Sequence, residues 1–111
     1  MKVNSYYYEI YQVEPEKEFA FMKWEWAKKY NWTFKDYNRV FKSYGAAISD
    51  YDLLNYLFKI FNIDLPERFK GHSMSVSDIV KICINGDENK AKYYYCDSFG
   101  WVDITKEIKG E

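Results

Sequence analysis

The fold is decided by the stretch Phe69-Lys70-Gly71-His72-Ser73-Met74-Ser75-Val76-Ser77-Asp78-Ile79-Val80 and by a second stretch, Tyr93-Tyr94-Tyr95-Cys96-Asp97-Ser98-Phe99-Gly100-Trp101. The first is a polar segment of turn-forming residues that leads into an apolar strand. The second is an aromatic strand that closes on a glycine. Together they predict two neighbouring strands of a sheet, and they name no reaction.

The sequence between and around these stretches predicts a hairpin. Residues 79–84 are rich in β-branched side chains, which favours a largely buried strand. Residues 85–89 read Asn-Gly-Asp-Glu-Asn, a hairpin turn. Residues 91–96 then return antiparallel to the first strand, and we expect residues 99–102 to continue this strand past a bulge at Gly100.

Two further strands are expected nearer the N-terminus. Residues 3–13 are dense in tyrosine and isoleucine with partial alternation, which predicts a strand. One face of it holds Tyr6, Tyr8 and Ile10, and the other holds Tyr7, Glu9 and Tyr11. Residues 37–44 alternate in the same way, and we expect Gly45 to end that strand.

The clearest helix is predicted from Ser49 to Asn62. Ser49 is a good N-terminal cap, and Asp50 and Asp52 lie near the positive end of the helix dipole. The spacing of the apolar residues predicts a buried stripe. Its members are Leu53, Leu54, Leu57, Phe58 and Phe61.

A second helix ends near Asn31, and its start is open between two alternatives. Acidic residues around Pro15 and lysines at the far end favour a helix that begins at Pro15. One face of that helix would carry Phe19, Met22, Trp26 and Tyr30. Alternatively, residues 19–22 are extended and the helix runs only from Lys23 to Tyr30.

The length and composition support one domain over residues 1–111, and the predicted strands and helices make it α+β. A chain of 111 residues with 48% apolar and 22% aromatic side chains has room for a single hydrophobic core. We expect a small antiparallel sheet of about four to five strands with a C-terminal β-hairpin. Two helices, over residues 49–62 and 24–30, are expected to pack on one face of this sheet.

Charge and sequence pattern favour a cytoplasmic location. Sixteen basic and seventeen acidic residues give a net charge of −1, so no global field attracts the chain to a polyanion. The start, Met1-Lys2-Val3-Asn4-Ser5, lacks the apolar core of a secretory signal. No segment approaches the ~18 apolar residues of a membrane span.

Residues 62–101 resemble the YodL-like domain. The resemblance is carried by His72-Ser73-x-Ser75-x-Ser77-Asp78 and by Asp97-Ser98-Phe99-Gly100-Trp101. That family is found in Gram-positive bacteria, chiefly on conjugative elements and prophages, and has no established activity. The resemblance therefore implies a small cytosolic accessory protein of a mobile element. We expect a structural role for the motif residues Gly71, His72, Ser73, Ser75, Ser77, Asp78, Asp97, Ser98 and Gly100.

The motif contains the residue types of a nucleophilic triad, but not its arrangement. A triad needs a base oriented against a serine in three dimensions, whereas successive residues of an extended segment alternate sides. We therefore expect these side chains to satisfy backbone groups at a turn and assign no catalytic residue. His72, Cys83, Cys96 and Asp97 lack the paired spacing of zinc ligands, so neither a metal nor a cofactor is expected.

The two cysteines are expected to be reduced and mostly buried. A loop over residues 85–90 sets Ile84 opposite Ala91 and Cys83 opposite Lys92. Cys96 would then lie on the order of 13 Å farther along the strand, which is beyond the reach of a disulfide.

Two surfaces are candidates for binding. The segment 23–42 interleaves basic and aromatic residues, as a surface for single-stranded nucleic acid does. Its candidate phosphate contacts are Lys28, Lys29, Lys35, Arg39 and Lys42. Tryptophan is a preferred anchor of protein interfaces, and the candidate anchors are Trp24, Trp26, Trp32 and Trp101.

The function expected from these features is non-enzymatic protein binding for a phage or conjugative element. The partner we expect is a host defence nuclease or CRISPR effector, which would make the chain an anti-CRISPR or anti-restriction inhibitor. The small size, the aromatic excess, the mild acidity and the setting of the family motivate this hypothesis. The alternative is an accessory factor that binds nucleic acid through residues 23–42. The sequence leaves the oligomeric state open.

Overall fold

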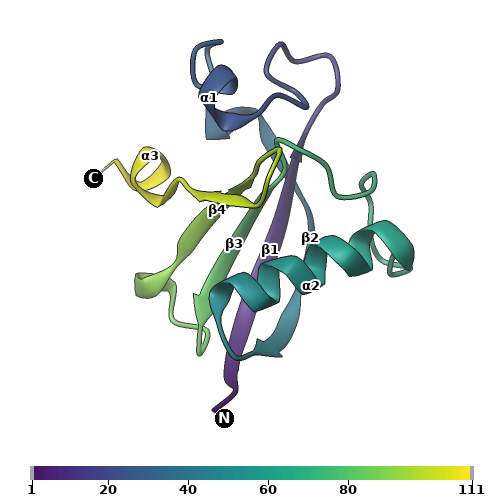
Figure 1. Cartoon of the computed structure of the whole chain (residues 1–111), viewed down its shortest axis with the longest axis vertical. Coiled ribbons are helices and arrows are strands. Elements are labelled where there is room, and N and C mark those ends of the chain that lie inside the picture. The colour runs from purple at the N-terminus through teal and green to yellow at the C-terminus, as the bar shows by residue number, and fades with distance from the viewer. Residues whose placement is uncertain (1, 111) are drawn as a thin grey trace.

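The computed structural model describes residues 2–110, and its centre is a five-stranded antiparallel sheet with the strand order β2-β1-β3-β4-β5 (Figure 1). The strands are β1 (Asn4–Val13), β2 (Tyr37–Ala47), β3 (Ile79–Ile84), β4 (Lys92–Cys96) and β5 (Trp101–Asp103). The expected α+β class and the number of strands are confirmed. No helix within the described residues is long and apolar enough to cross a bilayer.

Helix α2 (Asp50–Ile63) covers one face of the sheet (Figure 1). Ser49 caps it as expected, since its Oγ accepts a hydrogen bond from the Asp52 amide at 3.2 Å. The predicted stripe is confirmed at Leu53, Leu54, Leu57 and Phe61, which are buried. The prediction is wrong at Phe58, which is 42% exposed.

The position of Phe58 on the helix explains its exposure. It lies seven residues after Tyr51 and four before Asn62, and these spacings place all three on one side of a helix. Tyr51 and Asn62 are both exposed, so this side faces solvent.

The first core cluster lies between α2 and the sheet. The even-numbered residues of β1 point toward α2, as the alternation predicts. They pack with α2 and with side chains of β2, β3 and β4, giving the cluster Tyr6, Tyr8, Ile10, Phe41, Leu53, Leu54, Leu57, Phe61, Met74, Val80, Ile82 and Tyr94.

The second core cluster lies on the opposite face, at one end of the sheet. It is closed by α1 (Trp24–Ala27), the 3-10 turn η1 (Phe34–Asp36) and α3 (Thr105–Lys109). The Trp24 ring lies 5.0 Å from that of Tyr95, whereas the neighbouring Tyr94 packs in the α2 cluster. Adjacent strand residues point to opposite faces. The expectation that both helices pack on one face is therefore wrong.

Helix α1 has only four residues. It begins at Trp24, so a helix from Pro15 is wrong, and it ends before Tyr30. Residues 14–23 instead form successive turns, with the Lys17 amide bonded to the Glu14 carbonyl at 3.1 Å. The charge order and the helical spacing of four apolar residues had both favoured the longer helix, namely Phe19, Met22, Trp26 and Tyr30.

Strand β2 continues past Gly45 to Ala47, so the expected end at Gly45 is wrong. A Cβ at Gly45 would lie 3.3 Å from the Leu53 side chain, so this glycine lets α2 pack closely on the strand. The β1–β2 register also shifts between Ile10 and Tyr11, which interrupts the alternation expected along β2.

The chain turns back after β4 instead of continuing as one strand. The Asp97 amide bonds to the Gly100 carbonyl at 2.9 Å, and Gly100 has φ +80°. Strand β5 then pairs antiparallel to β4, with Trp101 opposite Cys96. The C-terminal hairpin is confirmed, since β3 and β4 also pair antiparallel, and the continuous strand through Gly100 is wrong.

The register of the β3–β4 hairpin differs from the prediction by one residue. Lys92 pairs with Ile82 rather than with Cys83, because the connection includes the 3-10 turn η2 (Glu88–Lys90). Both cysteines are free thiols and buried, as expected.

Candidate functional site

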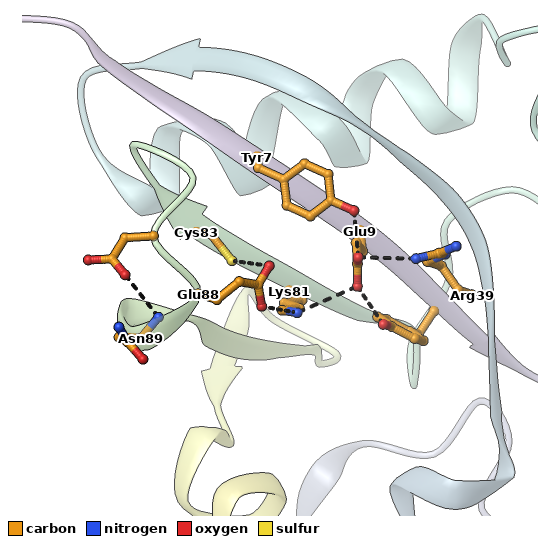
Figure 2. Close-up of polar contacts among 9 residues, drawn as sticks. Tyr7, Glu9, Arg39, Lys81, Cys83, Glu88 and Asn89 are labelled. Carbon is orange, nitrogen blue, oxygen red and sulfur yellow. Dashed lines mark hydrogen bonds and ion pairs between the residues drawn. The ribbon is translucent and has the colours of Figure 1, made fainter.

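The sheet has one face that points away from α2, and α1 and α3 cover only part of it. The uncovered part carries polar side chains, and we call it the open face. It is formed by Tyr7 and Glu9 of β1, by Arg39 of β2, and by Lys81 and Cys83 of β3 (Figure 2). These β1 and β3 positions are odd-numbered, so they point away from α2. The alternation of β1 predicted this face, but not its polar partners.

The Glu9 carboxylate is the centre of the open face, and the residue is only 5% exposed. The Tyr7 hydroxyl donates a hydrogen bond to Oε2, and the Tyr11 hydroxyl donates one to Oε1. Arg39 Nη1 lies 3.3 Å from Oε2, and Lys81 Nζ lies 3.8 Å from Oε1. Figure 2 shows these groups converging on the carboxylate. The contacts compensate the burial of the charge.

The same contacts set the protonation state of Glu9. Burial raises the pKa of the carboxyl, but the hydrogen bonds from Tyr11 and Tyr7 and the charges of Lys81 and Arg39 outweigh burial and lower it. Glu9 is therefore ionised at neutral pH. It accepts hydrogen bonds and has no proton to donate as a general acid.

Glu88 of η2 extends the network beyond Lys81 of β3. Its carboxylate lies 2.7 Å from Lys81 Nζ and accepts a weak hydrogen bond from Cys83 Sγ at 3.6 Å. Burial and the neighbouring Glu88 charge raise the pKa of Cys83 to about 11. At neutral pH this group is a thiol, which is a poor nucleophile compared with a thiolate.

A hollow of about 510 Å³ lies along the outer edge of the open face. It is lined by Tyr7, Lys42, Ser43, Tyr44, Arg68, Gly86 and Glu88. The rings of Tyr7 and Tyr44 are 5.4 Å apart, and Tyr44 is 79% exposed. This surface can offer both aromatic and charged contacts to a ligand.

The YodL-like motif packs against β1 through Gln12, a residue that sequence analysis missed. Gln12 Nε2 donates to the His72 carbonyl at 2.8 Å and to Asp78 Oδ2 at 2.9 Å, while its Oε1 accepts from the His72 amide at 3.0 Å. Gln12 is buried and follows Ile10 on the α2-facing row of β1. The sequence signal that could have identified Gln12 is a polar residue in the otherwise apolar row of β1.

Asp78 is the most buried carboxyl of this motif, at 1% exposed. Its Oδ2 accepts from Gln12 Nε2 and from the Ser75 amide, both at 2.9 Å. Burial raises the pKa of Asp78 to about 7, and these bonds and the nearby His72 oppose the rise only in part.

Other motif residues hold the segment that leads into α1. Ser77, at φ 87°, accepts from the Phe21 amide through Oγ at 2.9 Å and from the Tyr37 hydroxyl through its carbonyl at 2.6 Å. Asp97 Oδ1 accepts from the Trp24 amide at 3.0 Å. These contacts tie residues 21–24 to the end of the sheet.

The remaining motif residues lie near the surface. His72 Nδ1 lies 2.7 Å from the Ser73 carbonyl, and Ser75 Oγ donates to the same carbonyl at 2.9 Å. Ser73, Ser98 and Gly100 are exposed. In this arrangement the His72 ring contacts a backbone carbonyl and not a serine hydroxyl.

The structure does not bring the four candidate tryptophan anchors together. Trp24 and Trp32 pack edge to face at 4.9 Å and are partly buried in the second core cluster. Trp101 packs beside the first cluster, and its Nε1 donates to Asn55 Oδ1 at 3.3 Å. Trp26 is 51% exposed, so it has the largest accessible surface of the four.

The candidate cations divide between two surfaces. Lys28 and Lys35 line a hollow of about 620 Å³, together with Trp24, Trp32 and Phe34. Arg39 and Lys42 lie on β2, where Arg39 pairs with Glu9, and Lys29 extends from the end of α1 over the ring of Trp26. Within residues 2–110, no group of three or more His, Cys, Asp or Glu side chains could hold a metal ion.

Comparison with known proteins identifies one family. A search of curated proteins found no match, and neither did a search of solved structures. The YodL-like domain matches residues 7–106, a range that includes most of β1, all of β2 and the whole motif. The chain therefore belongs to the YodL-like domain family.

Proposed function

We propose that this protein is a non-enzymatic binding protein that docks onto another protein. The observation that carries the proposal is the exposure of four large apolar side chains of α2, with Tyr51 and Phe58 on one side of the helix and Tyr56 and Ile63 on another. Their exposed fractions are 51% for Tyr51, 58% for Tyr56, 42% for Phe58 and 73% for Ile63. Aromatic residues exposed in this number on one element are typical of interaction surfaces.

The protonation states of the two cysteines and of Glu9 support binding rather than catalysis by these groups. Burial raises the pKa of Cys96 to about 12, and that of Cys83 is raised to about 11 by burial and the Glu88 charge. Both are thiols at neutral pH. Glu9 is held ionised by four partners, so its charge is already neutralised within the protein.

The partner we propose is a host defence nuclease, such as a restriction enzyme or a CRISPR effector. The setting of YodL-like proteins on prophages and conjugative elements supports this choice, and so does the small size of the domain. The protein would then serve a mobile element as an anti-restriction or anti-CRISPR accessory factor in the host cytoplasm.

An affinity pull-down tests the proposal. The tagged protein is incubated with lysate of a Gram-positive host that carries restriction and CRISPR systems, with and without nuclease treatment. We expect one stoichiometric protein partner that survives the treatment. The double variant Tyr56→Ser/Phe58→Ser should lose it, while Phe99→Ser should retain it, because Phe99 is 97% exposed but lies in the β4–β5 turn. Loss of every partner on nuclease treatment contradicts the proposal.

The hollow beside α1 favours a second candidate, binding of single-stranded nucleic acid. Trp24, Trp32 and Phe34 line it together with Lys28 and Lys35, and stacking platforms for bases combine such residues. Labelled single-stranded DNA and RNA test this candidate directly. Salt-sensitive binding that disappears in Lys28→Glu/Lys35→Glu supports it. Binding that is absent, or unchanged in that variant, refutes it.

A further inference from the structure

Strand β2 is an edge strand whose outer side is open over most of its length. It pairs with β1 on one side only. Within the described residues, the one backbone bond on its outer side runs from the Lys70 amide to the Val40 carbonyl at 3.4 Å. Residues 41–47 therefore present backbone groups to solvent, which makes them available to another strand.

The register shows which backbone groups point outward. Tyr6, Tyr8 and Ile10 of β1 pair with Gly45, Ser43 and Phe41. The amide of Asn85 donates to the Ser5 carbonyl, so odd-numbered residues of β1 direct their backbone groups toward β3 and even-numbered ones toward β2.

The partners of the even-numbered residues therefore point their own backbone groups inward. The residues between them on β2 must point theirs outward, because backbone groups alternate along a strand. The outward N–H and C=O groups belong to Lys42, Tyr44 and Ala46.

Two hollows meet at this edge, one on each face of the sheet. Ser43 and Tyr44 line both of them. The hollow on the α2 side has a volume of about 390 Å³, and its apolar walls include Phe41, Leu57 and Ile60. A strand added to β2 would direct alternate side chains into the two hollows.

The charge of the edge indicates which strand fits. Strand β2 contains two cations, Arg39 and Lys42, and no acidic residue. The Arg68 guanidinium lies 5.3 Å from the centre of the Phe41 ring and lines the open-face hollow with Lys42. Within residues 2–110, neither Lys42 nor Arg68 forms an ion pair. An acidic strand would supply the missing partners.

The same charges disfavour a second copy of this chain as the occupant. Two β2 edges paired with each other would bring Lys42 and Arg68 of both copies to one interface, without a compensating acid in either strand. Like charges on paired strands are destabilising.

We propose that the outer edge of β2 binds an extended acidic segment of a partner protein as an added sixth strand. Its apolar side chains enter the hollow beside α2, and its carboxylates face Lys42 and Arg68. The inference rests on the proposed protein-binding function. It extends the α2 surface to the neighbouring β2 edge, since Tyr56 of α2 lines the hollow there, and it assigns a class of ligand.

Selection from a random peptide display library tests the proposal. We expect enriched peptides that alternate apolar residues with Asp or Glu. N-methylation of one such synthetic peptide should weaken binding at every second position and leave the intervening positions unaffected, because only alternate amides bond to β2. The proposal is overturned if the selected peptides do not alternate apolar and acidic residues. It is also overturned if N-methylation weakens binding without a period of two residues.

Two pairs of variants locate the site. Tyr44→Pro removes an outward N–H but leaves the β1–β2 ladder intact, whereas the control Tyr44→Ala keeps the N–H. We expect Tyr44→Pro to bind the peptide at least about tenfold more weakly than Tyr44→Ala, with both variants folded by circular dichroism. Lys42→Glu/Arg68→Glu should reject the acidic peptide and accept its lysine-substituted counterpart.

The outcomes separate this inference from the proposed function. A partner that is captured from lysate equally by Tyr44→Pro and Tyr44→Ala leaves protein binding intact and refutes the β2 site. A dimer in solution that Tyr44→Pro disrupts, with no peptide binding, shows that a second copy occupies the edge and also refutes the proposal.

Discussion

The side-chain amide of Gln12 on β1 donates a hydrogen bond to the carboxylate of Asp78, a residue 66 positions away, at 2.9 Å. The same amide group also bonds to the backbone of His72 in both directions. One side chain thus joins the central strand to the motif that precedes β3. The motif is held in place by contacts that are buried and specific in geometry.

Replacing Asp78 by alanine should destabilise the fold. The change leaves Gln12 Nε2 and the Ser75 amide without their shared acceptor. We expect a loss of about 3 kcal/mol in the free energy of unfolding, measured by urea denaturation. Asp78→Asn should cost much less, because both bonds end on one oxygen that the Asn carbonyl can replace. Equal losses in the two variants would show that these bonds do not stabilise the motif.

The stability of the protein should fall as pH rises from about 4 to about 7, because of Asp78. Its pKa is about 7 in the folded state against 3.8 ordinarily, so in this range the folded state binds a proton that the unfolded state has released. The contribution is fully present below the unfolded pKa and is lost as pH rises through the folded one. The slope is at most about 1.4 kcal/mol per pH unit.

The control for this pH dependence is Asp78→Asn, which cannot titrate. The difference in unfolding free energy between wild type and variant should change with pH between about 4 and 7 and be constant above. Glu9 acts with the opposite sign, since its lowered pKa gives a contribution that is lost as pH falls through the acid range. A difference that is independent of pH would refute the assignment to Asp78.

Gly71→Ala should act through Gln12. A Cβ at this position would lie 2.0 Å from Gln12 Oε1, so the Gln12 side chain must move and lose its bonds. We expect the alanine to cost about 2 kcal/mol in wild type and less in a Gln12→Ala background, where the clashing oxygen is gone. A double-mutant cycle by urea denaturation measures this coupling. If the destabilising effects of Gly71→Ala and Gln12→Ala add, the need for a glycine at position 71 does not come from the Gln12 side chain.

Both cysteines should resist modification in the native state. Cys83 and Cys96 are 0% and 2% exposed, and their pKa values are raised to about 11 and about 12. Labelling by a thiol-specific disulfide reagent at pH 8 should be slow and should accelerate with urea in parallel with unfolding. Rapid labelling of either thiol without denaturant would contradict the burial of that side chain.

Local patterns predicted the main elements well. Alternation identified β1, β-branched residues identified β3, and the stripe with its Ser49 cap identified α2. The errors arose where a distant contact decides the local structure. Gly45 lies inside β2, where the absence of a side chain lets α2 pack closely, and no local pattern reports that approach.

The candidate sites were harder to predict than the fold. The partners of Glu9 come from three strands, so they could be grouped only after the order β2-β1-β3 was known. Tryptophan content suggested Trp24 and Trp32 as anchors, yet both pack in the second core cluster. The open edge of β2 depends on strand order, which the sequence left open.

Amide hydrogen exchange along β2 tests the central claim most directly. In the free protein, the outward amides of Lys42, Tyr44 and Ala46 should exchange rapidly, and the inward amides of Ser43 and Gly45 slowly. Addition of a selected acidic peptide should slow the three outward amides and leave the inward ones unchanged. Outward amides that are already protected in the free monomer, or that stay rapid when the peptide is bound, would contradict the account.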